Sequence, residues 1–238
     1  MGATPPAVAQ APLVDAKAAI DLLRRWLAPV VPADAAAWLD AEIERQGAGL
    51  DARRLGIALG LIGRKVGRRP LALPPEEVAA AQVLRPGWQP QFWGTDETAR
   101  VAVLLATHRG EDAAFAARVD KLCQTAEITE HVSYLKGFAI FPAPAALHAR
   151  AREGVRSSIG AVFEAIACRN PYPHDHFDEA AWNQMVVKCV FVGAPLETIV
   201  GLNQRRNPEL LQMLRDFVAE RHAAGRPLPE EVHRFIEG

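Results

Sequence analysis

The stretch NPYPHDHFDEAAWNQMVVKCVFVGAPL (170–196) holds both the end of one helix and the start of the next. A proline keeps the residue before it out of the α conformation, so the first proline predicts that a helix ends at Asn170. The second proline predicts an extended Tyr172 in the same way, and Asp178 is a good N-cap for a new helix. Four residues of that new helix are spaced to form one apolar face: Trp182, Met185, Val186 and Cys189.

The same helical period runs through nearly every other part of the chain. Segments end at Gly, Pro or Asn, and none alternates polar and apolar residues with the period of a strand. We therefore expect an all-α fold of about a dozen helices, each of ~10–17 residues. Two architectures fit this pattern: a HEAT/armadillo-like α-α superhelix and an irregular helical bundle. No clean repeat of about 40 residues decides between them.

The domain organisation is simple. Residues 1–12 are rich in alanine and proline and are expected to form a disordered lead, whereas 13–238 are expected to form a single all-helical domain. The one soft internal join is the Pro-, Gly- and Trp-rich segment near 85–94. Its three large aromatic residues are too apolar to be solvated and are expected to plug the join between two layers: Trp88, Phe92 and Trp93.

Composition excludes several classes of protein. The 238 residues are 50% hydrophobic and 23% charged with a net charge of -1, which is ordinary for a globular protein and offers no general attraction for nucleic acid. The three cysteines are widely spaced, which argues against a disulfide framework and a cysteine zinc site. No secretory signal and no apolar run of ~18 residues is present, so we expect a cytoplasmic protein without a transmembrane segment.

One basic run stands out against this balance. The stretch RRLGIALGLIGRKVGRR (53–69) carries six cations and no acid. Such a run predicts either a solvated helix face or a surface that contacts anionic lipid or a partner.

Polar residues gather in the C-terminal half in a way that packing alone does not require. Lys188 and an arginine from 205–206 could neutralise a carboxylate or phosphate, with Asn183 and Tyr172 beside them in one pocket. The competing interpretation is a buried hydrogen-bond network that satisfies broken helix ends.

Metal and cofactor chemistry find little support in the sequence. His174 and His176 are plausible metal ligands, but no third ligand stands at a fixed spacing. The phosphate-binding loop, the dinucleotide-binding glycine motif and the nucleophile elbow are all missing. We therefore predict no metal site and no cofactor.

Four blocks resemble the EboA family: SYLKGFAIFP (133–142), VFEAIACRNPYP (162–173), WNQMVVKCVFVGAPLETIVGL (182–202) and ERHAAGR (220–226). They occur in the family's order and cover about the last 100 residues. The resemblance implies that residues matching the family pattern are candidates for ligand binding. They are Tyr134, Lys136, Asn170, Tyr172, Trp182, Asn183, Lys188, Arg206, Asn207, Glu220 and Arg226.

The resemblance implies a role in a secondary-metabolite pathway. Genes of this family typically lie in the ebo cluster, beside genes for enzymes that include a membrane prenyltransferase. The implied role is making or exporting a compound such as a prenylated cyclitol or phenolic. The chain would act as a helical protein that binds a small-molecule intermediate or other ebo-cluster enzymes. The alternatives are a structural adaptor that docks the prenyltransferase, and an enzyme using Lys188, Tyr172 and Arg206 in acid–base or anion-clamping roles.

Overall fold

The computed structural model describes residues 13–49 and 51–238, so the expected disordered lead at 1–12 lies outside the described residues. Within them the chain forms thirteen α-helices and no β-strand, which confirms the all-α class. In the N-terminal half the helices are α1 (Ala16–Leu27), α2 (Ala33–Ala48), α3 (Ala52–Lys65), α4 (Pro75–Leu84), α5 (Thr95–Leu105) and α6 (Asp112–Thr125). In the C-terminal half they are α7 (Ile128–Gly137), α8 (His148–Arg156), α9 (Gly160–Ala167), α10 (Tyr172–His176), α11 (Glu179–Val192), α12 (Pro208–Ala223) and α13 (Glu230–Glu237). Short 3₁₀ turns η1 (Pro90–Phe92), η2 (Pro144–Leu147) and η3 (Leu196–Thr198) connect some of them.

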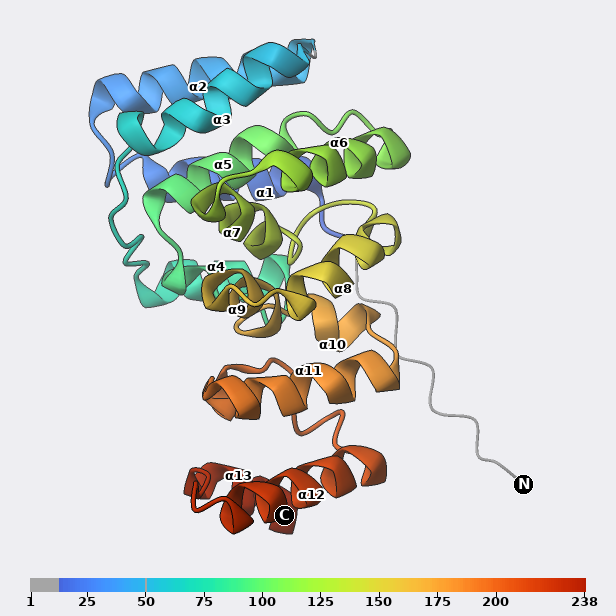
Figure 1. The fold of residues 1–238 in the computed structure, drawn as a ribbon. Helices are drawn as coiled ribbons and strands as arrows, with labels where there is room; N and C mark the ends of the chain where they lie inside the picture. The colour runs from blue at the N-terminus through green and yellow to red at the C-terminus, as the bar shows by residue number, and fades with distance from the viewer. Residues whose placement is uncertain (1–12, 50) are drawn as a thin grey trace.

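Helix α5 lies at the centre of the larger part of the molecule. Nearly all of its residues are buried, because α1, α2, α3 and α7 pack around it. A helix that is covered on every side is typical of the core of a bundle. The helices beyond it follow in layers, with the α2–α3 pair at one end of the molecule and the α12–α13 pair at the other (Figure 1). The all-α bundle is thus established, and the HEAT-like superhelix is not confirmed.

The segment near 85–94 is rich in aromatic residues. Trp88 and Trp93 are buried; the Trp88 ring lies tilted at 5.3 Å from Trp26 of α1 and edge-on at 5.4 Å from Trp93. Neither tryptophan is solvated, as expected, whereas 54% of the surface of Phe92 is exposed. The Phe92 ring instead packs under the Arg169 guanidinium, which lies 4.4 Å from the ring centroid, and the expectation of a buried Phe92 is wrong.

The Asn-Pro-Tyr-Pro elbow separates α9 from α10. The first helix ends before Asn170, as the sequence predicts, but Tyr172 begins α10 and is not extended. The side-chain oxygen of Asn170 accepts a hydrogen bond from the Tyr172 N–H at 3.0 Å, which provides a cap for this short helix. A proline within the first turn costs no hydrogen bond, so the capped turn prevails over the local preference of the residue before Pro173.

Candidate functional site

Asn170 and Tyr172 hold the elbow together from inside. The Asn170 side-chain amide donates to the carbonyls of Leu135 and Ala165 at 3.0 and 3.1 Å. The Tyr172 hydroxyl donates to the Pro144 carbonyl at 2.6 Å, and burial raises the pKa of this phenol. Both side chains thus connect α7, α9 and α10 through bonds within the protein.

Asn183 and Asn207 form a reciprocal amide pair between α11 and α12. The Asn183 Nδ2 donates to the Asn207 Oδ1 at 3.2 Å, and the Asn207 Nδ2 donates back to the Asn183 Oδ1 at 2.9 Å. The Asn207 Oδ1 also accepts from the Leu210 N–H, which confirms the predicted N-cap of α12. Asp178 likewise caps α11, as expected, by accepting from the Ala181 N–H.

Two of the candidate cations bind the carbonyl ends of helices. Lys188 donates to the carbonyls of Val155 and Ser157, both at 2.7 Å, at the end of α8, and burial lowers the pKa of this amine. Arg206 donates to the carbonyls of Phe235 and Ile236 at the end of α13. Cations at a helix C-terminus are stabilised by the orphan carbonyls and by the helix dipole. These bonds do not test the acid–base and anion-clamping roles of Lys188 and Arg206, which stay predictions.

The remaining candidates lie apart from one another. Trp182 is fully buried and has the guanidinium of Arg205 over its ring at 4.7 Å, and Tyr134 is buried near the protein centre. Glu220 and Arg226 are exposed on the α12 side of the molecule. Two of the sequence candidates, Lys136 and Asn170, line one shared cavity.

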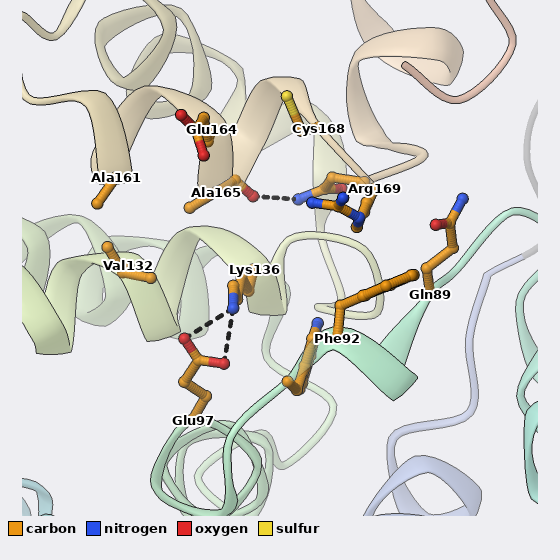
Figure 2. A pocket seen from close by; sticks show the side chains of 12 residues that line it. Gln89, Phe92, Glu97, Val132, Lys136, Ala161, Glu164, Ala165, Cys168 and Arg169 are labelled. Carbon is orange, nitrogen blue, oxygen red and sulfur yellow. Dashed lines mark hydrogen bonds and ion pairs between the residues drawn. The ribbon is translucent and has the colours of Figure 1, made fainter. Parts of the chain in front are cut away.

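That cavity, of about 270 Å³, lies between α7, α9, the start of α5 and the join near Phe92 (Figure 2). We call it the Lys136 cavity. The half-exposed Phe92 makes it accessible from solvent. Its polar and apolar groups face one another across a small space. They are Gln89, Phe92, Trp93, Glu97, Val132, Lys136, Ala161, Glu164, Ala165, Cys168, Arg169 and Asn170.

An ion pair forms one wall of the Lys136 cavity. The Lys136 ammonium donates to both carboxylate oxygens of Glu97, at 2.7 and 2.6 Å (Figure 2). Glu97 also accepts the Gly94 N–H at 2.7 Å, which fixes this carboxylate at the first turn of α5. Both side chains keep some exposure, 23% for Lys136 and 17% for Glu97. Because an ammonium has three donors, Lys136 retains one for an oxygen that enters the cavity.

Arg169 lies across the cavity from this pair and has an unusual backbone. Its φ of 56° is in the left-handed region, and its N–H donates to the Thr198 carbonyl at 2.6 Å. Its guanidinium lies 4.4 Å from the centroid of the Phe92 ring. A left-handed conformation costs a residue with a Cβ about 1–2 kcal/mol, and such strain clusters at functional sites.

A second cavity adjoins the first. It measures about 440 Å³ and contains Arg68 and Arg69, and it shares Phe92, Glu97 and Lys136 with the Lys136 cavity. The Lys136–Glu97 pair therefore lines both hollows.

Sequence reasoning missed three of the residues that build this site. In the sequence, Glu97 looks like an ordinary acidic residue in the first turn of a helix. Arg169 looks like a residue that only precedes the elbow, and Phe92 looks like a core residue. Two features of the sequence could have indicated this site: the aromatic Phe92 in a Pro- and Gly-rich segment, and Lys136, which matches the family pattern. The separation of these segments along the chain hides their contact.

The histidines of the elbow are engaged with neighbours. His174 bonds Asp175 at 2.7 Å, and the His176 ring lies 4.6 Å from the Tyr172 ring. In the described part of the chain, no three His, Cys, Asp or Glu side chains are grouped to hold a metal ion.

Stability is expected to depend on pH through His176. Burial lowers the pKa of this half-buried imidazole below its ordinary 6.5, against the weaker opposing effect of Asp175. The unfolded chain then takes up the proton more readily, so the free energy of unfolding should fall as the pH drops through 6.5 towards the lower folded pKa. Urea unfolding at pH 7.5 and 5.0 should show a smaller loss for His176→Gln than for the wild type. An equal loss of stability in the wild type and the variant would exclude His176 as the origin of the effect. Burial also lowers the pKa of His131, so the variant should keep part of the pH dependence.

Fold and site together define an all-α protein with a small, solvent-accessible cavity whose wall carries a lysine–glutamate pair and an arginine. Residues 19–237 match the family model described as "Metabolite traffic protein EboA", so the chain belongs to the EboA family. That description fits a metabolite-associated role. Neither the curated proteins nor the solved structures include a match to this chain. No helix of the described residues is long and apolar enough to cross a membrane.

Proposed function

We propose that this protein binds a small organic metabolite in the Lys136 cavity and carries it between partners. The ligand has an acidic group, a carboxylate or phosphate, and a flat apolar part. The observation that carries this proposal is the placement of Lys136 and Arg169 around one cavity with the exposed ring of Phe92.

The two cations suit an anionic group better than a neutral one. Lys136 has a donor left after its two bonds to Glu97, and the guanidinium of Arg169 has five N–H donors in a fixed fork. A carboxylate or phosphate can accept from both groups, and such charge-assisted bonds are about twice as strong as neutral ones.

The size of the cavity limits the ligand. A volume of about 270 Å³ is at the small end of ligand pockets, which supports a compact molecule such as a single-ring acid. The exposed edge of Phe92 and the small side chains of Ala161 and Ala165 offer the apolar surface.

The pathway and partners are part of the same proposal. A secondary-metabolite pathway fits the family, with the cargo a phenolic or cyclitol precursor handed to another ebo-cluster enzyme. A membrane prenyltransferase is one such enzyme. Partial exposure of the cavity supports a carrier, because cargo can leave without unfolding of the chain.

Titration calorimetry with 4-hydroxybenzoate as the probe tests the site. We expect binding that weakens about tenfold or more in the double variant Lys136→Met/Glu97→Gln, which removes one charge-assisted contact worth ~1.5 kcal/mol or more without leaving an unpaired carboxylate. The uncharged probe 4-hydroxybenzamide should bind weakly to the wild type.

Arg169→Gly provides a second variant that separates binding from stability. Glycine relieves about 1–2 kcal/mol of left-handed strain and loses a cation–π contact of about 0.5–1 kcal/mol, so stability should stay within about 1 kcal/mol of the wild type. Binding should weaken about tenfold. Lys188→Met, a cation outside the cavity, is the matched control and should bind as the wild type does. The proposal is wrong if the cavity variants bind the acid unchanged.

A further inference from the structure

The outward side of α3 is a basic stripe with an apolar centre, which we call the α3 face. Residues three and four apart share one side of a helix, so the exposed positions of α3 fall in line. The α3 face consists of the half-buried Leu61 and five exposed residues: Arg53, Arg54, Ile57, Arg64 and Lys65.

The opposite side of α3 holds the helix in the protein. Leu55, Ala58, Leu59 and Ile62 are buried against the core. Ile57 is 54% exposed, a large value for an isoleucine in the middle of a helix. Figure 1 shows α2 and α3 together at one end of the molecule, far from α12 and α13.

Positive charge dominates this face. Within the described residues, no ion pair joins Arg53, Arg54, Arg64 or Lys65 to a carboxylate, whereas cations nearer the core such as Arg100, Lys136 and Arg150 are paired. The nearby carboxylates are Asp51, which caps α3, and Glu130, whose oxygen lies near Gly60. Beyond the helix end, Arg69 adds a further exposed cation, whereas Arg68 lies 3.8 Å from the Asp96 carboxylate.

We propose that the α3 face docks the protein on a bilayer that carries anionic headgroups. Arg53 and Arg64 are about 17 Å apart along the helix axis, with Ile57 and Leu61 between them. This order suits an interfacial helix, because the cations reach the headgroups at both ends while the apolar side chains enter the boundary of the acyl chains. A nucleic acid would use the cations but would leave Ile57 without an apolar partner.

The interaction is local and depends on neither the Lys136 cavity nor its ligand. The whole chain has a net charge of -1, so the attraction arises from the arrangement of charge and not from its total. It should fall steeply with salt, since exposed charges are screened within about 8 Å at physiological ionic strength.

Co-sedimentation with vesicles tests the proposal with the full chain. Vesicles of phosphatidylcholine with a third phosphatidylglycerol should bind the protein at low salt, and vesicles of phosphatidylcholine alone should not. Each surface cation contributes about fivefold to such binding, so Arg53→Gln/Arg54→Gln/Lys65→Gln should weaken it roughly a hundredfold. Ile57→Gln should weaken binding about tenfold through the lost apolar contact.

A matched triple variant controls for total charge. Arg215→Gln/Arg226→Gln/Arg234→Gln removes the same charge from exposed positions on the α12–α13 side. It should bind anionic vesicles as the wild type does. The proposal is overturned if the wild type fails to sediment with anionic vesicles at low salt. It is equally overturned if the two triple variants lose the same affinity for anionic vesicles. A third outcome against it would be that Ile57→Gln binds these vesicles as the wild type does while added RNA displaces the protein from them.

Discussion

Asn170→Ala should lower the free energy of unfolding by about 3–4 kcal/mol, the largest effect we expect from a single polar substitution. Asn170 is only 3% exposed and makes three hydrogen bonds, two as a donor and one as an acceptor. Alanine leaves the carbonyls of Leu135 and Ala165 and the N–H of Tyr172 without this partner. The Leu135 carbonyl keeps its bond from the Phe138 N–H, so the loss falls mainly on the Ala165 carbonyl and the Tyr172 N–H, each costing about 1–3 kcal/mol before local relaxation.

Urea unfolding followed by circular dichroism measures this effect. Asn203→Ala is the matched control, because Asn203 is exposed on the surface and its loss should change stability by less than about 0.5 kcal/mol. Asn170→Asp should also destabilise, since a carboxylate would face the two carbonyls that now accept from the amide. A loss below about 1 kcal/mol for Asn170→Ala would contradict the role of this side chain as the lock of the elbow.

Asn207→Ala should cost about 2–3 kcal/mol. Removing an N-cap side chain costs about 1 kcal/mol, and the Asn183 amide, 1% exposed, would lose both bonds to its partner. Helix α12 should become less stable first, because its start depends on the bond from the Leu210 N–H to Asn207.

A double-mutant cycle separates the cap from the amide pair. Asn183→Ala alone should also destabilise, and the double variant should lose less than the sum of the two single losses by about 1–2 kcal/mol. Additive losses would show that the two amides act independently. Asn207→Asp keeps the cap acceptor while it loses the donated bond, so it should be intermediate between the wild type and Asn207→Ala.

Local signals predicted local structure well. The caps at Asp178 and Asn207 depend on a residue and the few positions after it, and both are present. The end of α9 before Asn170 follows from the proline rule. The failure at Tyr172 has an equally local cause, because the Asn170 side chain caps the next turn and outweighs the proline's effect on its neighbour.

The candidate site could not be predicted from local sequence signals, because the residues that contact each other there are far apart along the chain. Lys136 lies 39 residues along the chain from its partner Glu97. Lys188 lies 33 and 31 residues from Val155 and Ser157, whose carbonyls it bonds. A lysine that caps a helix and a lysine that lines a cavity look alike in a sequence. Both stand on helices among apolar residues, and only the fold decides which carbonyl or carboxylate meets each.

Glu97 bonds both the cavity wall and the start of the central helix. One of its oxygens bonds only the lysine of the cavity wall, and the other also holds the backbone where the central helix begins. Whatever draws Lys136 away from this carboxylate also changes the electrostatic environment of the first turn of α5. A ligand that accepts the third donor of Lys136, as we propose, would therefore be in electrostatic contact with the helix around which α1, α2, α3 and α7 are assembled.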